Sequence, residues 1–332
     1  MTNIHFLLIL LISLPCYISL EIPPDEDLEP SQVVDLFNKF VKEYGKIYPT
    51  PAEQTEALSA FSENWVNIQE FVRYTYLEII NFFRLNDHVK NQNLKFGFNQ
   101  YSDLADSDFS EIVVNLETSE SGTQKSQKAS NRIGSVPSFL DWRTRKDTVG
   151  PVRNQGTSRC GWAYAASAVV QSAYSLKTAR LVQPSEVDVC NSSSAKNLES
   201  GFEWMKTFGV HLESSAEKIT LYDVSRFVPI DTDDLQRALM NSGPIAVTFK
   251  VGTSFRHYKS GVFNSADCGN TGTFLGIHAA VLVGYGEDYG SPYWIVKNSW
   301  GENFGEQGYV KMLRMHDLYA LESTYSPKRV GT

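Results

Sequence analysis

Reactive side chains gather with glycine and tryptophan in three segments of this chain. The segments are GPVRNQGTSRCGWAYAA at 150–166, GIHAAVLVGYG at 276–286 and YWIVKNSWGENFGEQGYVKM at 293–312. They supply a thiol at Cys160, an imidazole at His278 and carboxamides at Gln155 and Asn298. A thiol with an imidazole is a combination used in nucleophilic catalysis, in which a side chain bonds covalently to the substrate.

The elements that must position these groups divide into a helical half and a strand half. Apolar residues and alanines at 162–173 recur at helical spacing, and the small residues let another backbone pack closely. A further helix is expected at 233–240. Apolar runs predict strands at 245–249, 279–286, 293–297 and 308–312. Helices followed by strands indicate an α+β fold.

The N-terminus carries the longest apolar run, at 6–18. It is too short to span a bilayer, and its position predicts a signal peptide at 1–19. A buried N-terminal helix is the alternative. We therefore expect no membrane span, and a secreted or a lysosomal or endosomal protein.

Two helical patterns follow the apolar run. One covers 33–44, with Ser31 as its expected cap, and the other begins at Glu53 and continues as far as Leu85. The polar stretch at 118–131 predicts an exposed linker and cleavage region. The chain thus divides into the signal peptide, an N-terminal segment at 20–134 with a helical domain at about 33–110, and a module at 135–332.

Composition excludes several classes of protein. The chain has 332 residues, of which 42% are hydrophobic, so fibrous and wholly disordered classes are excluded. The formal charge of −8 disfavours nucleic acid as a partner. We expect a monomer.

The three segments make the chain resemble a papain-family cysteine peptidase precursor of the cathepsin L-like group. The long-helix motif of that family's inhibitory propeptide is matched by Glu53, Phe61, Asn64 and Ile68, and its GxNxFxD motif by Gly97, Asn99, Tyr101 and Asp103. Ala57 replaces the motif's arginine. The resemblance implies a papain-like two-lobed fold, with a helical left lobe and a β-rich right lobe, preceded by a helical inhibitory propeptide.

The resemblance also implies a role for each reactive residue. In such enzymes a thiolate at a helix N-terminus attacks the peptide carbonyl, a histidine holds and then donates the proton, and an asparagine orients the imidazole. Those roles fall to His278 as general base and Asn298 as orienting residue, while Gln155 stabilises the oxyanion. Trp162 opens the helix, and Trp300 shields the pair of His278 and Asn298 from water.

The nucleophile position is where the resemblance fails. The family's cysteine lies six positions after the oxyanion glutamine and directly before the tryptophan, and here that position is Gly161. Cys160 lies one residue too early, and neighbouring side chains at a helix start point in different directions. It is a nucleophile only after a local backbone shift, and otherwise a free thiol or a partner in a rearranged disulfide. Without a thiolate partner, His278 should titrate as an ordinary imidazole.

The other cysteines also depart from the family pattern. Removing the signal peptide leaves Cys160, Cys190 and Cys268, so at least one thiol lies outside any intramolecular disulfide. Cys190 and Cys268 match family disulfide positions whose partners are missing, which predicts a less stable domain unless the thiols pair in a new way. SAKNLESG at 194–201 replaces the family's GCNGG segment, so we expect an altered peptide-binding groove.

No other motif indicates a cofactor or a metal. The histidines show no HExxH spacing, and we expect His257 and His316 to be solvated surface residues. Asn191 begins an Asn-Ser-Ser triplet, which is a candidate glycosylation site.

These observations support three hypotheses of function. The preferred one is a peptidase homologue that lacks normal proteolysis and acts by binding its own propeptide, peptide or protein ligands, or protease inhibitors. The alternative is an active or weakly active endopeptidase that uses Cys160 with His278 and Asn298. A decayed coding sequence is the third.

Overall fold

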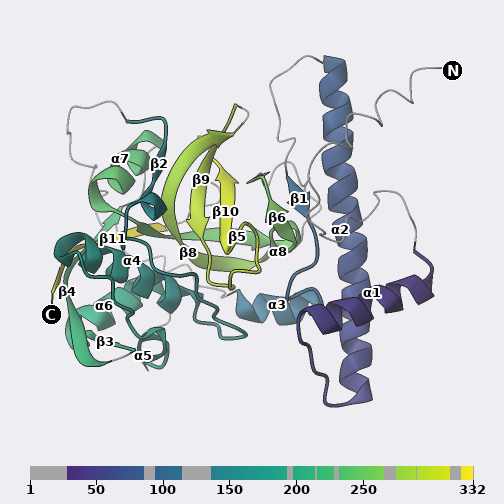
Figure 1. The fold of residues 1–332 in the computed structure, drawn as a ribbon, viewed down its shortest axis with the longest axis horizontal. Helices are drawn as coiled ribbons and strands as arrows, with labels where there is room; N and C mark the ends of the chain where they lie inside the picture. Colours follow the sequence, from purple (N-terminus) through teal and green to yellow (C-terminus); the bar gives the residue numbers. More distant parts are fainter. Residues whose placement is uncertain are drawn as a thin grey trace.

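The computed structural model describes residues 28–85, 94–113, 136–192, 197–213, 215–227, 232–264, 274–288, 290–314 and 323–331. A helical N-terminal segment lies beside a larger module of helices and strands (Figure 1). The predicted signal peptide, the predicted linker at 118–131, Cys268 and His316 lie outside the described residues.

Two crossing helices form the N-terminal segment (Figure 1). They are α1 (Pro30–Glu43) and α2 (Pro51–Leu85), and Phe37 and Phe40 of α1 pack on Phe61 of α2. Both predicted helices are confirmed, but the expected cap is wrong. Helix α1 begins before Ser31, and the side chain of Gln32 accepts a hydrogen bond from the Glu29 N–H instead.

A buried arginine ties this segment to the larger module. Arg256 ends the short helix α8 (Thr253–Arg256), and its Nη2 lies 2.8 Å from Oδ1 of Asp106, at the start of α3 (Asp106–Ile112). Its Nη1 donates to the Leu104 carbonyl, and its guanidinium lies 5.1 Å from the Phe109 ring centroid. Beside it, strand β1 (Lys95–Phe96) pairs with β6 (Tyr258–Ser260). Since a buried charge is costly without its partners, these contacts hold the segment in place.

The first half of the module is helical, as predicted. It contains the short 3-10 helix η1 (Trp142–Thr144), α4 (Gly161–Thr178), α5 (Glu186–Cys190) and α6 (Leu198–Phe208). Trp162, Ala166 and Val170 recur on the buried side of α4. These small and apolar side chains let α4 lie against strand β8 (Phe274–Asp288) of the sheet.

The second half is built on one mostly antiparallel sheet. Its strands in spatial order are β3 (Val210–Leu212), β4 (Ser215–Phe227), β11 (Ser323–Gly331), β5 (Ile245–Gly252), β8 (Phe274–Asp288), β9 (Ser291–Lys297), β10 (Tyr309–Leu313) and β7 (Val262–Phe263), and β2 (Leu140–Asp141) also pairs with β8. Helix α7 (Thr232–Ser242) precedes β5. The predicted α+β class, α7 and the four predicted strands are confirmed.

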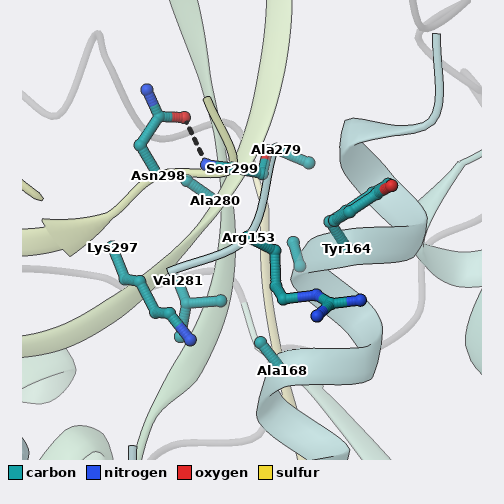
Figure 2. Close-up of a pocket in the computed structure, with 10 residues that line it drawn as sticks. Arg153, Tyr164, Ala168, Ala279, Ala280, Val281, Lys297, Asn298 and Ser299 are labelled. Atoms are coloured by element: carbon teal, nitrogen blue, oxygen red, sulfur yellow. Dashed lines mark hydrogen bonds between the residues drawn. The ribbon is translucent and has the colours of Figure 1, made fainter. Parts of the chain in front are cut away.

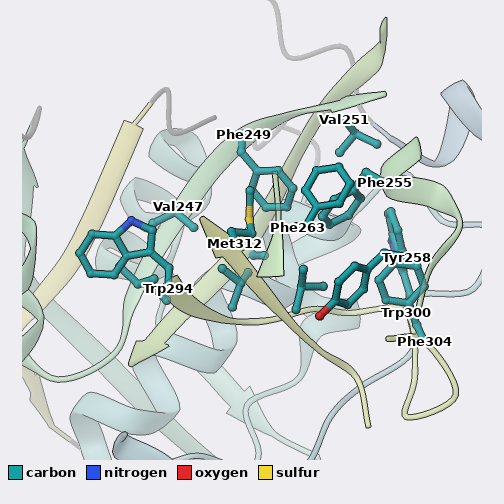
Figure 3. Packing of buried hydrophobic residues seen from close by; sticks show 14 of the residues in the cluster. Val247, Phe249, Val251, Phe255, Tyr258, Phe263, Trp294, Trp300, Phe304 and Met312 are labelled. Atoms are coloured by element: carbon teal, nitrogen blue, oxygen red, sulfur yellow. The ribbon is translucent and has the colours of Figure 1, made fainter. Parts of the chain in front are cut away.

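Aromatic rings fill the core next to the sheet (Figure 3). Trp300 is fully buried, with its ring centroid 5.8 Å from Phe255 and 4.6 Å from Phe304. Tyr101 and Phe109, from the N-terminal segment, also pack on it edge to face. The N-terminal segment therefore completes the core of the module. Among the described residues, no helix has the length and apolarity that crossing a bilayer requires.

A disulfide links the start of helix α4 to the end of helix α5. Cys160 precedes α4 and Cys190 ends α5, with Cα atoms 5.6 Å apart, a usual separation for a disulfide. Of the three states expected for Cys160, the rearranged disulfide is confirmed.

Removing this disulfide should destabilise the protein. The bond spans a sequence separation of 30 residues, for which the loss of unfolded-state entropy corresponds to about 3 to 4 kcal/mol. The double variant Cys160→Ser with Cys190→Ser should lose about that much free energy of unfolding in urea denaturation. Dithiothreitol should destabilise the wild type equally and leave the double variant unchanged; equal stability of wild type and variant without reductant would contradict the pairing.

Candidate active site

The structure brings the sequence-predicted site residues together where the two halves of the module meet. His278 lies on β8, Asn298 and Trp300 follow β9, and Gly161 and Trp162 open α4. Gln155 reaches the same place because its backbone N–H donates to the Ser299 carbonyl. The start of helix α4 and the sheet therefore face each other across one buried site.

His278 is held in one orientation. Its Nε2 lies 2.8 Å from Oδ1 of Asn298, and the ring of Trp300 lies 4.7 Å from the imidazole centroid. Asn298 is itself fixed, since its Oδ1 also accepts from the Ser299 N–H. Nδ1 of His278 thus remains directed toward the start of α4.

The backbone of Gly161 lies directly opposite that ring nitrogen. A Cβ atom built at Gly161 would lie 3.2 Å from Nδ1 and 3.0 Å from Cε1 of His278, and 2.9 Å from Oε1 of Gln155. A side chain at this position would point between the imidazole and the carboxamide, and the two must move by a few tenths of an ångström to admit it.

Gln155 makes contacts on both sides of the site. Its Oε1 accepts from the Ser299 hydroxyl at 2.6 Å, and its Nε2 donates to the Ser158 carbonyl at 2.8 Å. Nε2 also donates to the Ile112 carbonyl at 3.3 Å. The carboxamide nitrogen of Gln155 is thus directed at two backbone carbonyls, one in its own loop and one in the N-terminal segment.

The N-terminal segment occupies the site in this structure. Ile112 and Val113 are buried, and a Cβ atom at Gly276 would lie 2.8 Å from the Val113 carbonyl oxygen. Glycine at 276 therefore permits the close approach of this backbone. Glu111, one residue earlier, is ion-paired with Arg159. Residues 111–113 cover Gln155 and the start of α4.

Burial makes two histidines differ from the sequence predictions. The pKa of His278 falls to about 4, because burial disfavours the imidazolium, although the hydrogen bond to Asn298 favours it. An ordinary imidazole pKa was expected. His257, expected at the surface, is fully buried because β1 and Phe71 cover it, and burial also lowers its pKa.

A pocket of about 10 Å³ lies behind the site, between α4 and the sheet (Figure 2). Tyr164 and Ala168 of α4 line one side, and Lys297 of β9 lines the other. The space suits about one water molecule. Burial lowers the pKa of Lys297 to about 8, while nearby Glu186 favours the ammonium.

Residues 197–201, the described part of the segment that replaces the family's glycines, form the start of α6. Asn197 accepts a hydrogen bond from the Ser200 N–H, and Leu198 is buried in the first turn of α6. The predicted glycosylation site Asn191 is exposed after α5, and its triplet ends at Ser193, outside the described residues.

Sequence reasoning missed two contributors to the site. Ser299, which holds Gln155, was signalled by its place next to Asn298, whereas Ile112 carries no side-chain signal because its carbonyl makes the contact. The long β4 and β11 pair was also missed.

Comparison with known families matches both parts of the chain. The papain family cysteine protease model matches residues 136–217 and 209–327, and the cathepsin propeptide inhibitor domain (I29) model matches residues 37–109. Mouse pro-cathepsin H is 28% identical over 87% of this chain and 89% of its own length. Thiol protease aleurain of Arabidopsis thaliana is 30% identical over 86% of this chain and 81% of its own.

Solved structures agree with these matches. Digestive procathepsin L 3 of Tenebrio molitor larval midgut has a TM-score of 0.69 at 22% identity and covers 89% of this chain and 98% of its own. A recombinant stem bromelain precursor has a TM-score of 0.69 at 26% identity, with the same coverage. The papain-like fold with an N-terminal propeptide is thus confirmed, and the chain belongs to the papain family of cysteine peptidases.

Proposed function

We propose that this protein is a papain-family homologue that does not hydrolyse peptide bonds and acts by binding. The observation that carries the proposal is the position of Gly161 opposite Nδ1 of His278. In our proposal this is the place of the family's nucleophilic cysteine, and glycine offers only a backbone N–H there. We also propose that a propeptide at 20–134 precedes the peptidase-like domain at 135–332. In that domain Gln155 would hold the place of the oxyanion residue, His278 that of the general base and Asn298 that of the orienting residue.

The bonding of Cys160 supports the same proposal. The alternative hypothesis requires its thiol to turn toward His278, but its sulfur is bonded to Cys190. Attack on a carbonyl requires a free thiolate. In the disulfide-bonded state, therefore, neither Cys160 nor Gly161 offers a nucleophile.

The groups that remain around Gly161 are suited to holding a peptide. Gln155 donates to the carbonyl of Ile112, and Trp300 supports the propeptide residues Tyr101 and Phe109. We infer that after propeptide cleavage the same surface binds peptide or protein ligands, including inhibitors of active relatives. We also propose secretion or delivery to lysosomes, by the predicted signal peptide.

Proteolysis assays test the proposal. The wild type, with its propeptide cleaved, should leave fluorogenic peptides intact in oxidising and in reducing buffer. Loss of a nucleophile from an otherwise intact site costs on the order of 10⁶-fold in kcat, so Gly161→Cys should raise hydrolysis by about 10³-fold even with imperfect geometry.

Gly161→Ala is the matched control, because it adds the Cβ atom without the sulfur. It should fold and remain inactive. Efficient cleavage by the wild type that disappears in Cys160→Ser would overturn the proposal.

The protonation of His278 provides a separate test. The unfolded chain, with an imidazole pKa near 6.5, binds a proton before the folded chain, whose His278 pKa is about 4. The stability contributed by neutral His278 is therefore complete above pH about 6.5 and is lost as the pH falls toward 4, by about 3 kcal/mol.

Urea denaturation of the full chain at pH 7.5 and 4.5 measures this effect. His278→Gln should show a smaller loss of stability on acidification than the wild type, whereas His211→Gln, which removes an exposed imidazole paired with Asp188, should not reduce that loss. An NMR titration with a strongly raised His278 pKa would indicate a thiolate partner and refute the proposal.

A further inference from the structure

We propose that Cys190 is a modification site that forms a mixed disulfide with a low-molecular-weight thiol, and that Cys160 is the thiolate released by this exchange. The exchange takes place beside the candidate site and does not depend on whether the protein hydrolyses peptides.

One of the two cysteines lies at the N-terminus of a helix and the other at the C-terminus of a helix. Cys160 is the residue before the first turn of α4, a helix of 18 residues, whereas Cys190 is the last residue of α5. The N-terminus of a helix carries partial positive charge and stabilises a thiolate, and the C-terminus disfavours one. Cys160 should therefore have the lower thiol pKa of the pair.

Charged neighbours of the two cysteines act in the same direction. Arg159 directly precedes Cys160, and its only described ion-pair partner, Glu111, belongs to the propeptide. On the other side, Asp188 lies two residues before Cys190 and is paired with His211. A cation beside Cys160 favours its thiolate further, and loss of the propeptide removes the carboxylate that offsets this cation.

Both cysteines are only partly buried. In the exchange, the incoming thiolate attacks Sγ of Cys190 and the bond between the two Sγ atoms breaks. Its electron pair goes to Sγ of Cys160, which leaves as the thiolate. The sulfur with the lower pKa is the faster leaving group, so attack at Cys190 is favoured over attack at Cys160. A second thiol then displaces the adduct as a small-molecule disulfide and completes the reduction.

The released thiol would lie at the edge of the candidate site. Cys160 directly precedes Gly161, whose Cβ position lies 3.2 Å from Nδ1 of His278. Exchange would also remove the covalent link between the start of α4 and the end of α5. A reducing thiol would thus place a free thiolate at the edge of the ligand-binding surface and remove the covalent restraint on the start of α4.

The experiment uses the folded full chain with Cys16 and Cys268 replaced by serine, so that only the pair can react. The protein is incubated with glutathione, quenched with acid, alkylated and mapped by mass spectrometry. Early time points should show glutathione on Cys190 and the alkyl group on Cys160. After full reduction, the rate of Cys160 alkylation should reach half its maximum at a pH below the ordinary thiol pKa of about 8.5.

Two variants with the same change of charge sharpen the test. Arg159→Gln should slow the release of Cys160 several-fold and raise the midpoint of its alkylation. Lys177→Gln removes a positive charge in the last turn of α4 and should leave both unchanged. Early glutathione on Cys160, a midpoint at or above about 8.5, or a disulfide that yields only when the protein unfolds would overturn the proposal.

Discussion

The space between the start of α4 and the imidazole of His278 is the constraint on which the site depends. A Cβ atom at Gly161 would lie at 3.0 Å or less from atoms of both His278 and Gln155. These two side chains therefore leave too little room for a side chain at position 161 unless they move. The hydrogen bond to Asn298 and the ring of Trp300 hold His278 from the other side. In the account proposed here, binding groups persist around a position that provides no nucleophile.

The propeptide and the disulfide both act on this same region. Residues 111–113 cover it through the Ile112 carbonyl and the approach of Val113 to Gly276, while buried Arg256 anchors the helix that delivers them. Cys160 is tied to Cys190 one residue before the site begins. In our proposals the state of the helix start depends both on propeptide removal and on the redox state of one bond, and the pair of Glu111 and Arg159 connects the two.

Much of this arrangement could be predicted because it follows from local pattern. Apolar spacing located α2, α4, α7 and strands β5, β8, β9 and β10, and motif spacing placed Gln155, Gly161, His278 and Asn298 in one site. Burial and pairing between distant segments could not be predicted. Nothing local marks Arg256 and His257 as covered by the propeptide, and three cysteines allow several pairings, of which tertiary packing selected Cys160 with Cys190. The pKa of His278 follows from the same tertiary burial.

The most direct measurement of the central claim is labelling of the processed, non-reduced protein with an active-site-directed thiol epoxide, followed by peptide mapping. The account predicts that the peptide containing residues 160 and 161 remains unlabelled, since it offers no free sulfur. An epoxide adduct on Cys160, formed at the rate at which peptide cleavage is lost, would show that a working nucleophile is present and would contradict the account.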